Sequence, residues 1–128
     1  MFIKYHLPAI IWGILILYLL EIPKNNIPDF PFLQQFHFDK IVHFSIFFIF
    51  TILLIRCLGV QNSFQVFKKN PIITALVVSI IYGSILEYLQ GFSFIGRTRD
   101  ILDLTANIIG SISGIPCAKI LKKHLKMF

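Results

Sequence analysis

Four mainly apolar stretches, each close to the length that crosses a bilayer, constrain the fold of this chain more than any other feature. They run roughly from Leu7 to Ile22, Ile41 to Leu58, Ile72 to Gln90 and Ile101 to Leu121. A helix needs about 20 apolar residues to span the hydrocarbon core. Of the 128 residues, 56% are hydrophobic and 14% charged, which is far from the balance of a soluble domain. The sequence therefore predicts an all-α, polytopic membrane protein with four transmembrane helices in a single domain, residues 1–128.

The first stretch raises the question of a cleaved leader. Lys4 precedes the apolar run as in a signal peptide, but residues 21–23 offer no small-residue cleavage site. We therefore expect an uncleaved first span, with Pro8 in its first turns, where a missing amide donor is tolerated. The connection that follows, residues 21–38, contains three prolines and cannot be a regular helix throughout. Its phenylalanines predict that it lies along the membrane interface.

The distribution of the basic residues predicts the orientation of the spans. The net charge is +6, yet the bases lie in tails and loops beside the spans, so a nucleic-acid partner is not expected. In an alternating topology eight bases fall on one side, namely Lys4, Arg56, Lys68, Lys69, Lys119, Lys122, Lys123 and Lys126, and four on the other, namely Lys24, Lys40, Arg97 and Arg99. The positive-inside rule then places both termini in the cytoplasm.

Polar and charged residues gather at one end of the apolar stretches. Asp39, Lys40 and His43 open the second stretch, Glu87 and Gln90 close the third, and the fourth is entered through Arg97, Arg99, Asp100, Asp103 and Asn107. If the spans alternate in direction, the three groups meet on the extracytoplasmic side. Charge set partly into lipid is costly and usually functional, so this polar cluster is the candidate site.

Two of the predicted helices carry their polar and small residues on one face. In the third these are Ser79, Gly83, Glu87 and Gln90, and in the fourth Asp100, Asp103, Asn107, Gly110 and Gly114. Both series have spacings of three and four residues, which place their members on one side of a helix. We expect these faces to contact protein, with Gly83, Gly110 and Gly114 in helix packing. At about 1.5 Å per residue, Asn107 lies about 10 Å beyond Asp100 and needs a polar partner.

Each polar constellation admits a structural and a functional interpretation. Asp39 is a good N-cap and shares a helix face with His43, which is either an interfacial histidine or a proton-transfer group held by a carboxylate. Glu87 either contacts substrate or forms a structural ion pair with Lys40 or an arginine. The two arginines, Arg97 and Arg99, either anchor at head groups or bind a phosphate or carboxylate in two-pronged fashion. Four acids face three bases in this cluster, so much of it is expected to pair with itself.

The sequence lacks the motifs of metal, nucleotide and serine-hydrolase sites. Cys57 and Cys117 have no metal-ligand spacing with each other or with a histidine, and no metal or other cofactor is expected. The sequence also contains no Gly-rich phosphate loop and no nucleophile elbow.

Three sequence blocks resemble the VanZ-like family of small bacterial integral membrane proteins. They are Asp39 to Phe44, Tyr82 to Gln90, and Arg97 with Asp100, Asp103, Asn107, Gly110 and Gly114, and together they cover roughly residues 39–114. Arg97 rather than Arg99 matches the arginine of the family. The resemblance implies a multi-pass protein of the bacterial plasma (inner) membrane and cell envelope. The namesake of the family is linked to antibiotic resistance, specifically to a lipid-bearing glycopeptide, but the resemblance implies no settled reaction.

These observations support two hypotheses of different class. In the first, the protein binds an amphiphile (a lipid, a lipid-linked precursor or a lipoglycopeptide) through Lys40, Gln90 and Arg97. The alternative is an intramembrane hydrolase or transferase acting on a lipid-linked substrate, with Glu87 or His43 as general base. In a third, simpler case the polar network only locks the helices together; its members would be Asp39, His43, Glu87, Asp100, Asp103 and Asn107.

Overall fold

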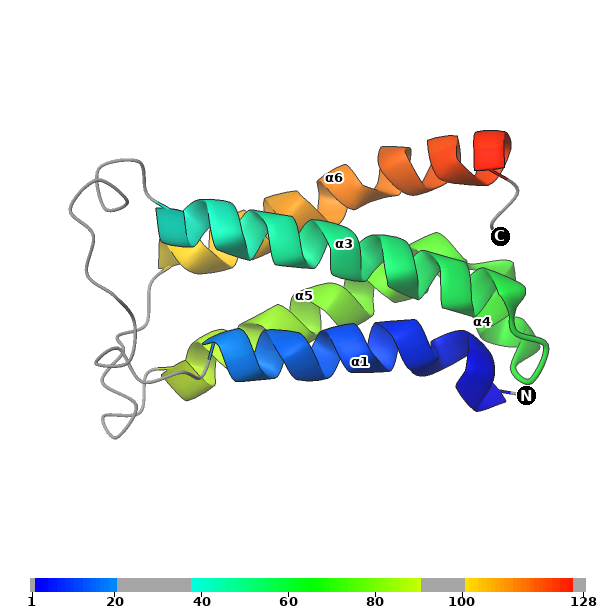
Figure 1. Ribbon diagram of the computed structural model, residues 1–128, viewed down its shortest axis with the longest axis horizontal. Helices are drawn as coiled ribbons and strands as arrows, with labels where there is room; N and C mark the ends of the chain where they lie inside the picture. The colour runs from blue at the N-terminus through cyan, green and yellow to red at the C-terminus, as the bar shows by residue number, and fades with distance from the viewer. Residues whose placement is uncertain (1, 21–37, 91–100, 126–128) are drawn as a thin grey trace.

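The computed structural model describes residues 2–20, 38–90 and 101–125, and these ranges are almost entirely helical, without a strand (Figure 1). The helices are α1 (Phe2–Leu20), α3 (Phe38–Val60), α4 (Gln65–Lys69), α5 (Pro71–Gln90) and α6 (Ile101–Leu125). The four long helices run side by side, and the short α4 lies at the end of the bundle where α3 ends and α5 begins. Of the described helices, α3, α5 and α6 are long and apolar enough to cross a membrane, and α1 is apolar but shorter. The all-helical prediction is confirmed, with three to four helices that could be spans.

Helix α1 differs most from its predicted bounds. It begins at Phe2 rather than near Leu7, so Pro8 lies inside the helix and removes the amide that would bond to the carbonyl of Lys4. Figure 1 shows a bend close to this end of α1. Two hydrogen bonds attach α1 to its neighbours: Trp12 Nε1 donates to the Ile46 carbonyl at 2.9 Å, and Tyr82 Oη donates to the Gly13 carbonyl at 2.6 Å.

Helices α3 and α6 approach most closely where α6 carries glycine. A Cβ placed on Gly110 would lie 2.3 Å from the carbonyl oxygen of Phe44, and one on Gly114 would lie 2.8 Å from that of Phe48. No side chain fits at either distance, so glycine permits the two backbones to touch. This contact holds the first halves of α3 and α6 together.

The interior has two apolar clusters separated by a polar layer. One cluster lies toward α4 and contains Ala9, Ile55, Cys57, Leu58, Ala75 and Ala118. The other lies toward the opposite end and contains Ile16, Ile46, Phe47, Phe50 and Leu86. Between them along α3, the fully buried Thr51 bonds to Ser79 of α5, which in turn contacts Ser111 of α6. Outward-facing side chains of all four long helices are largely apolar, as expected for helices in contact with lipid.

The connection between α3 and α5 is more ordered than the basic loop that the sequence predicted. Gln61 is fully buried and binds both polar groups of one backbone unit: its Oε1 accepts from the Phe64 amide at 2.8 Å and its Nε2 donates to the Phe64 carbonyl at 2.8 Å. The short helix α4 follows directly. The next helix, α5, begins at Pro71, one residue before the predicted apolar stretch, and proline is well suited to the first position of a helix.

Several predictions concern residues outside the described ranges. These are the proline-rich connection 21–37 and the segment 91–100, which includes Arg97, Arg99 and Asp100. Helix α3 begins at Phe38, so Asp39 lies within the first turn rather than at the predicted N-cap position. The side chains of Asp39 and Gln90 also lie outside what the structure describes.

Candidate binding site at the end of the bundle

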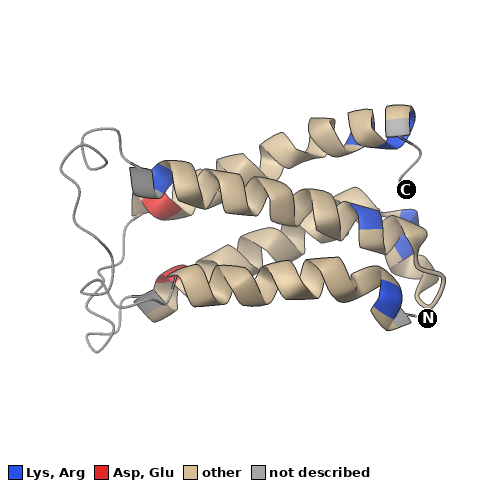
Figure 2. Cartoon of the chain, in the orientation of Figure 1, with Lys and Arg blue, Asp and Glu red and all other residues tan. Residues whose placement is uncertain are grey.

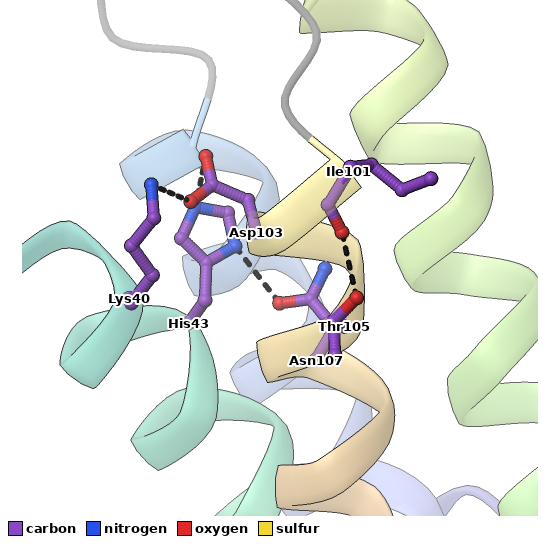
Figure 3. Close-up of polar contacts among 6 residues, drawn as sticks. All are labelled: Lys40, His43, Ile101, Asp103, Thr105 and Asn107. Atoms are coloured by element: carbon purple, nitrogen blue, oxygen red, sulfur yellow. Dashed lines mark hydrogen bonds and ion pairs between the residues drawn. The ribbon is translucent and has the colours of Figure 1, made fainter.

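Four polar side chains from two helices meet where α3 and α6 begin (Figure 3). Lys40 and His43 are three residues apart on α3, and Asp103 and Asn107 are four residues apart on α6, so each pair lies on one helix face. The close approach at Gly110, one turn further along α6, brings the two faces within reach of each other. The site is thus built on two rigid helices.

Asp103 and Asn107 contact His43 from two sides, and Asp103 also reaches Lys40. Lys40 Nζ lies 2.9 Å from Asp103 Oδ1, and His43 Nε2 lies 3.6 Å from Asp103 Oδ2. The second ring nitrogen, His43 Nδ1, lies 2.8 Å from Asn107 Oδ1. Asp103 therefore bridges a lysine and a histidine, while Asn107 fixes the orientation of the imidazole ring (Figure 3).

Exposure falls steeply from the rim of the site to its interior. The Lys40 and Asp103 side chains are 22% and 12% exposed, whereas His43 and Asn107 are each 2% exposed. Charge at the rim can be screened by water or head groups, but the inner pair lies in a low-dielectric interior where each polar atom needs a partner. The charged side chains therefore lie at the rim, and the buried pair His43 and Asn107 lies behind them and orients them.

The amide nitrogen of Asn107 makes no hydrogen bond to any side chain or backbone group that the structure describes. It points at α5, where a Cβ on Gly83 would lie 3.2 Å away. An asparagine amide can present either its oxygen or its nitrogen to a histidine ring. Glycine at position 83 leaves space for the amide in either orientation, so this site can match either neutral tautomer of His43 as well as its charged form.

A chain of hydroxyl groups continues from the site into the middle of the bundle. Ser111 Oγ donates to the Asn107 carbonyl at 2.8 Å, so the 2.7 Å contact between Ser79 and Ser111 requires the Ser79 hydroxyl to donate. Thr51 Oγ1 in turn donates to Ser79 Oγ at 3.1 Å. All three hydroxyl groups point the same way, which lets each bond strengthen the next.

Two members of this chain of hydroxyl groups, Thr51 and Ser111, were not predicted as site residues from the sequence. Ser111 lies four residues after Asn107 and Thr51 eight after His43, so both follow the polar faces of their helices. Helical spacing was therefore a signal that could have found them.

Glu87 lies on the same face of α5 as Ser79 and Gly83 and is buried at 7% exposure. Figure 2 shows that the described acidic residues lie at one end of the bundle, near the beginning of α6 and the end of α5. The structure brings Lys40, His43, Asp103 and Asn107 together, whereas Arg97 and the side chain of Gln90 fall outside its description. Within the described ranges, no group of three or more metal-ligating side chains forms a metal site.

Fold and site together define an all-helical protein with membrane-length apolar helices and a buried polar cluster at one end. The family model described as VanZ/LLP1 matches residues 4–122, and the chain therefore belongs to the VanZ/LLP1 family. The match includes α1, which the three sequence blocks did not cover. No curated protein and no solved structure matches the chain.

Proposed function

We propose that this protein binds an amphiphile with an anionic head group at the end of the bundle where α3 and α6 begin. Candidate ligands are a membrane lipid, a lipid-linked envelope precursor or a lipoglycopeptide antibiotic. The observation that carries the proposal is the ion pair between Lys40 and Asp103, which forms the rim of a site whose inner members are buried. The proposed location is the outer leaflet of the bacterial plasma membrane, because the larger number of bases lies at the opposite end.

An ion pair at the rim of the site allows Lys40 to exchange Asp103 for an anionic ligand. The Lys40 ammonium is a flexible point charge, and a phosphate or carboxylate arriving from the leaflet would compete with Asp103 for it. His43 Nε2 lies 3.6 Å from the other oxygen of Asp103, so a small movement of the carboxylate would give it a new partner when Lys40 turns to the ligand. We propose that Arg97 and Gln90 complete the head-group site.

Native mass spectrometry of the purified protein with phosphatidylglycerol and phosphatidylcholine tests this proposal. In Lys40→Gln we expect loss of the preference for the anionic lipid at one site. Lys119→Gln is the matched control, since it removes the same charge from an exposed position of α6 near the other end. Equal lipid preference in wild type and Lys40→Gln would refute the proposal.

Asp103→Asn separates binding from a purely structural role. If Asp103 competes with the ligand for Lys40, removing its charge should raise the affinity for the anionic head group. If the network only locks the helices together, the same variant should lower folded yield and leave lipid preference unchanged.

The position of His43 favours a second candidate function. A histidine held between a carboxylate and an amide resembles the arrangement that orients a general base, and the alternative is an intramembrane hydrolase or transferase on a lipid-linked envelope substrate. In this arrangement His43 is buried behind Asp103, so the substrate proton would pass through the carboxylate at the rim. Turnover of a lipid-linked substrate that persists in both His43→Gln and Glu87→Gln would exclude these residues as the base.

A further inference from the structure

The end of the bundle opposite the candidate site is strongly basic. Among the residues that the structure describes, it carries Lys4, Arg56, Lys68, Lys69, Lys119, Lys122 and Lys123. The described acidic residues Glu87 and Asp103 lie at the other end (Figure 2). No acidic residue of the described chain lies at this end, so its surface is complementary in charge to an anionic partner.

Helix α4 combines this charge with exposed apolar side chains. None of its residues is buried. Val66 is 73% exposed, and the flanking Phe64 and Phe67 are 51% and 41% exposed, with their ring centroids 5.8 Å apart. Lys68 and Lys69 form the last turn of the helix. Aromatic and apolar groups beside lysines are typical of a segment that lies in the interface between hydrocarbon and head groups.

The turn before α4 holds these side chains in a fixed position. Buried Gln61 binds the amide and the carbonyl of Phe64, which sets where α4 starts. Lys68 Nζ donates to the side-chain oxygen of Asn62 across the turn. The segment from 61 to 69 is thus a preformed surface, which reduces the entropy lost when a ligand binds.

We infer that α4 and the turn before it form a binding site for an anionic phospholipid of the leaflet at this end. Phe64 and Phe67 would contact the upper acyl chains, and Lys68 and Lys69 would contact the phosphate. Helix α4 lies between the ends of two membrane-length helices, where a phospholipid presents a phosphate and acyl chains together, so a lipid accounts for both features. This site is distinct from the proposed amphiphile site, which lies at the far end of the same helices.

Native mass spectrometry with phosphatidylglycerol against phosphatidylcholine, at two salt concentrations, tests the inference. Each lysine at a membrane surface contributes about fivefold to anionic-lipid affinity, so Lys68→Gln with Lys69→Gln should lower the affinity for phosphatidylglycerol at least tenfold. The matched control is Lys122→Gln with Lys123→Gln, which removes the same charge from α6 and should change the affinity less than twofold. Phe67→Ser should lower the affinity for both lipids without altering the salt dependence of binding.

Two results would overturn the inference. An equal loss in both double-lysine variants would show diffuse attraction to the basic end and no site at α4. Displacement of bound phosphatidylglycerol by an acidic peptide, in the wild type and in Phe67→Ser alike, would show that charge alone is recognised. Lys40→Gln distinguishes this site from the first one, because it should leave lipid binding at α4 unchanged.

Discussion

Replacing Gly110 by alanine should open the contact between α3 and α6 and disable the polar site. The added Cβ would lie 2.3 Å from the Phe44 carbonyl oxygen and 3.0 Å from the Phe44 Cα. These are backbone atoms of a helix, so no side-chain rotation can relieve the overlap. The helices must separate by about 1 Å before the contact reaches an ordinary distance, which is the kind of overpacking that costs about 1–3 kcal/mol.

The same displacement reaches the site through the rigid first half of α6. Asn107 lies one turn from Gly110, and its 2.8 Å contact with His43 is within 1 Å of the limit for a hydrogen bond. An opening of about 1 Å would therefore break it and leave a buried imidazole nitrogen without its partner. We expect Gly110→Ala to lose both stability and preference for an anionic amphiphile.

Two other glycines provide graded controls. A Cβ on Gly114 would lie 2.8 Å from the Phe48 carbonyl oxygen, so its alanine variant should cost about half as much. A Cβ on Gly59 meets nothing within 4 Å, so Gly59→Ala should be neutral or stabilise α3 by up to about 1 kcal/mol through helix propensity.

Denaturant unfolding in detergent micelles can rank the three variants. Circular dichroism reports helix content, and fluorescence of Trp12, the single tryptophan, reports the contact between α1 and α3. The reasoning is wrong if Gly110→Ala is as stable as Gly59→Ala. It is also wrong if Gly110→Ala is destabilised but keeps wild-type lipid preference, because the glycine contact would then not position the site.

Three further variants test separate parts of the structure. Ser79→Ala interrupts the hydroxyl chain between two neighbours and should lower unfolding free energy by about 1–2 kcal/mol, measured by the same unfolding assay; an unchanged value would show that the chain adds no stability. Trp12→Phe removes the donor to the Ile46 carbonyl and should make α1 the first helix to lose protection in hydrogen exchange, whereas uniform exchange across all helices would contradict this. Gln61→Leu keeps a side chain of similar size that cannot bind the Phe64 backbone, so proteolysis between α3 and α5 should accelerate in this variant and not in a Ser63→Ala control, which changes an exposed side chain of the same turn.

The long apolar helices were predictable because apolar length is a local property of the sequence. The predicted core of each helix lies largely within its observed bounds, but the ends differ where polar residues continue the helix. Helix α6 extends past the predicted Leu121 through Lys122, Lys123 and His124. Basic side chains in a last turn interact favourably with the helix dipole and reach head groups, so the helix continues after the apolar run has ended.

The partners of His43 could not be predicted from spacing alone. Its i, i+4 relation to Asp39 predicted a carboxylate on its own helix, and the Asp39 side chain lies outside what the structure describes. The described partners are Asp103 and Asn107 from α6. Periodicity shows which residues share a helix face, but the height at which two faces meet depends on how closely the helices approach. Here that height is set by Gly110 against the backbone of Phe44, a relation between residues far apart in sequence.

Serine and threonine show the same limit most clearly, because in this bundle their hydroxyl groups form hydrogen bonds either within one helix or between helices. Ser84 and Thr105 are exposed, and each donates to the carbonyl four residues earlier in its own helix, Ile80 and Ile101. Thr51 and Ser79 are buried and bond across helices instead. Any serine or threonine in lipid can satisfy itself within its helix, so interhelical bonding is decided by whether a second hydroxyl stands opposite. The described helices meet that condition at the level where α3, α5 and α6 each present a hydroxyl group, and the resulting chain links the packing of the bundle centre to the backbone of Asn107 and hence to His43.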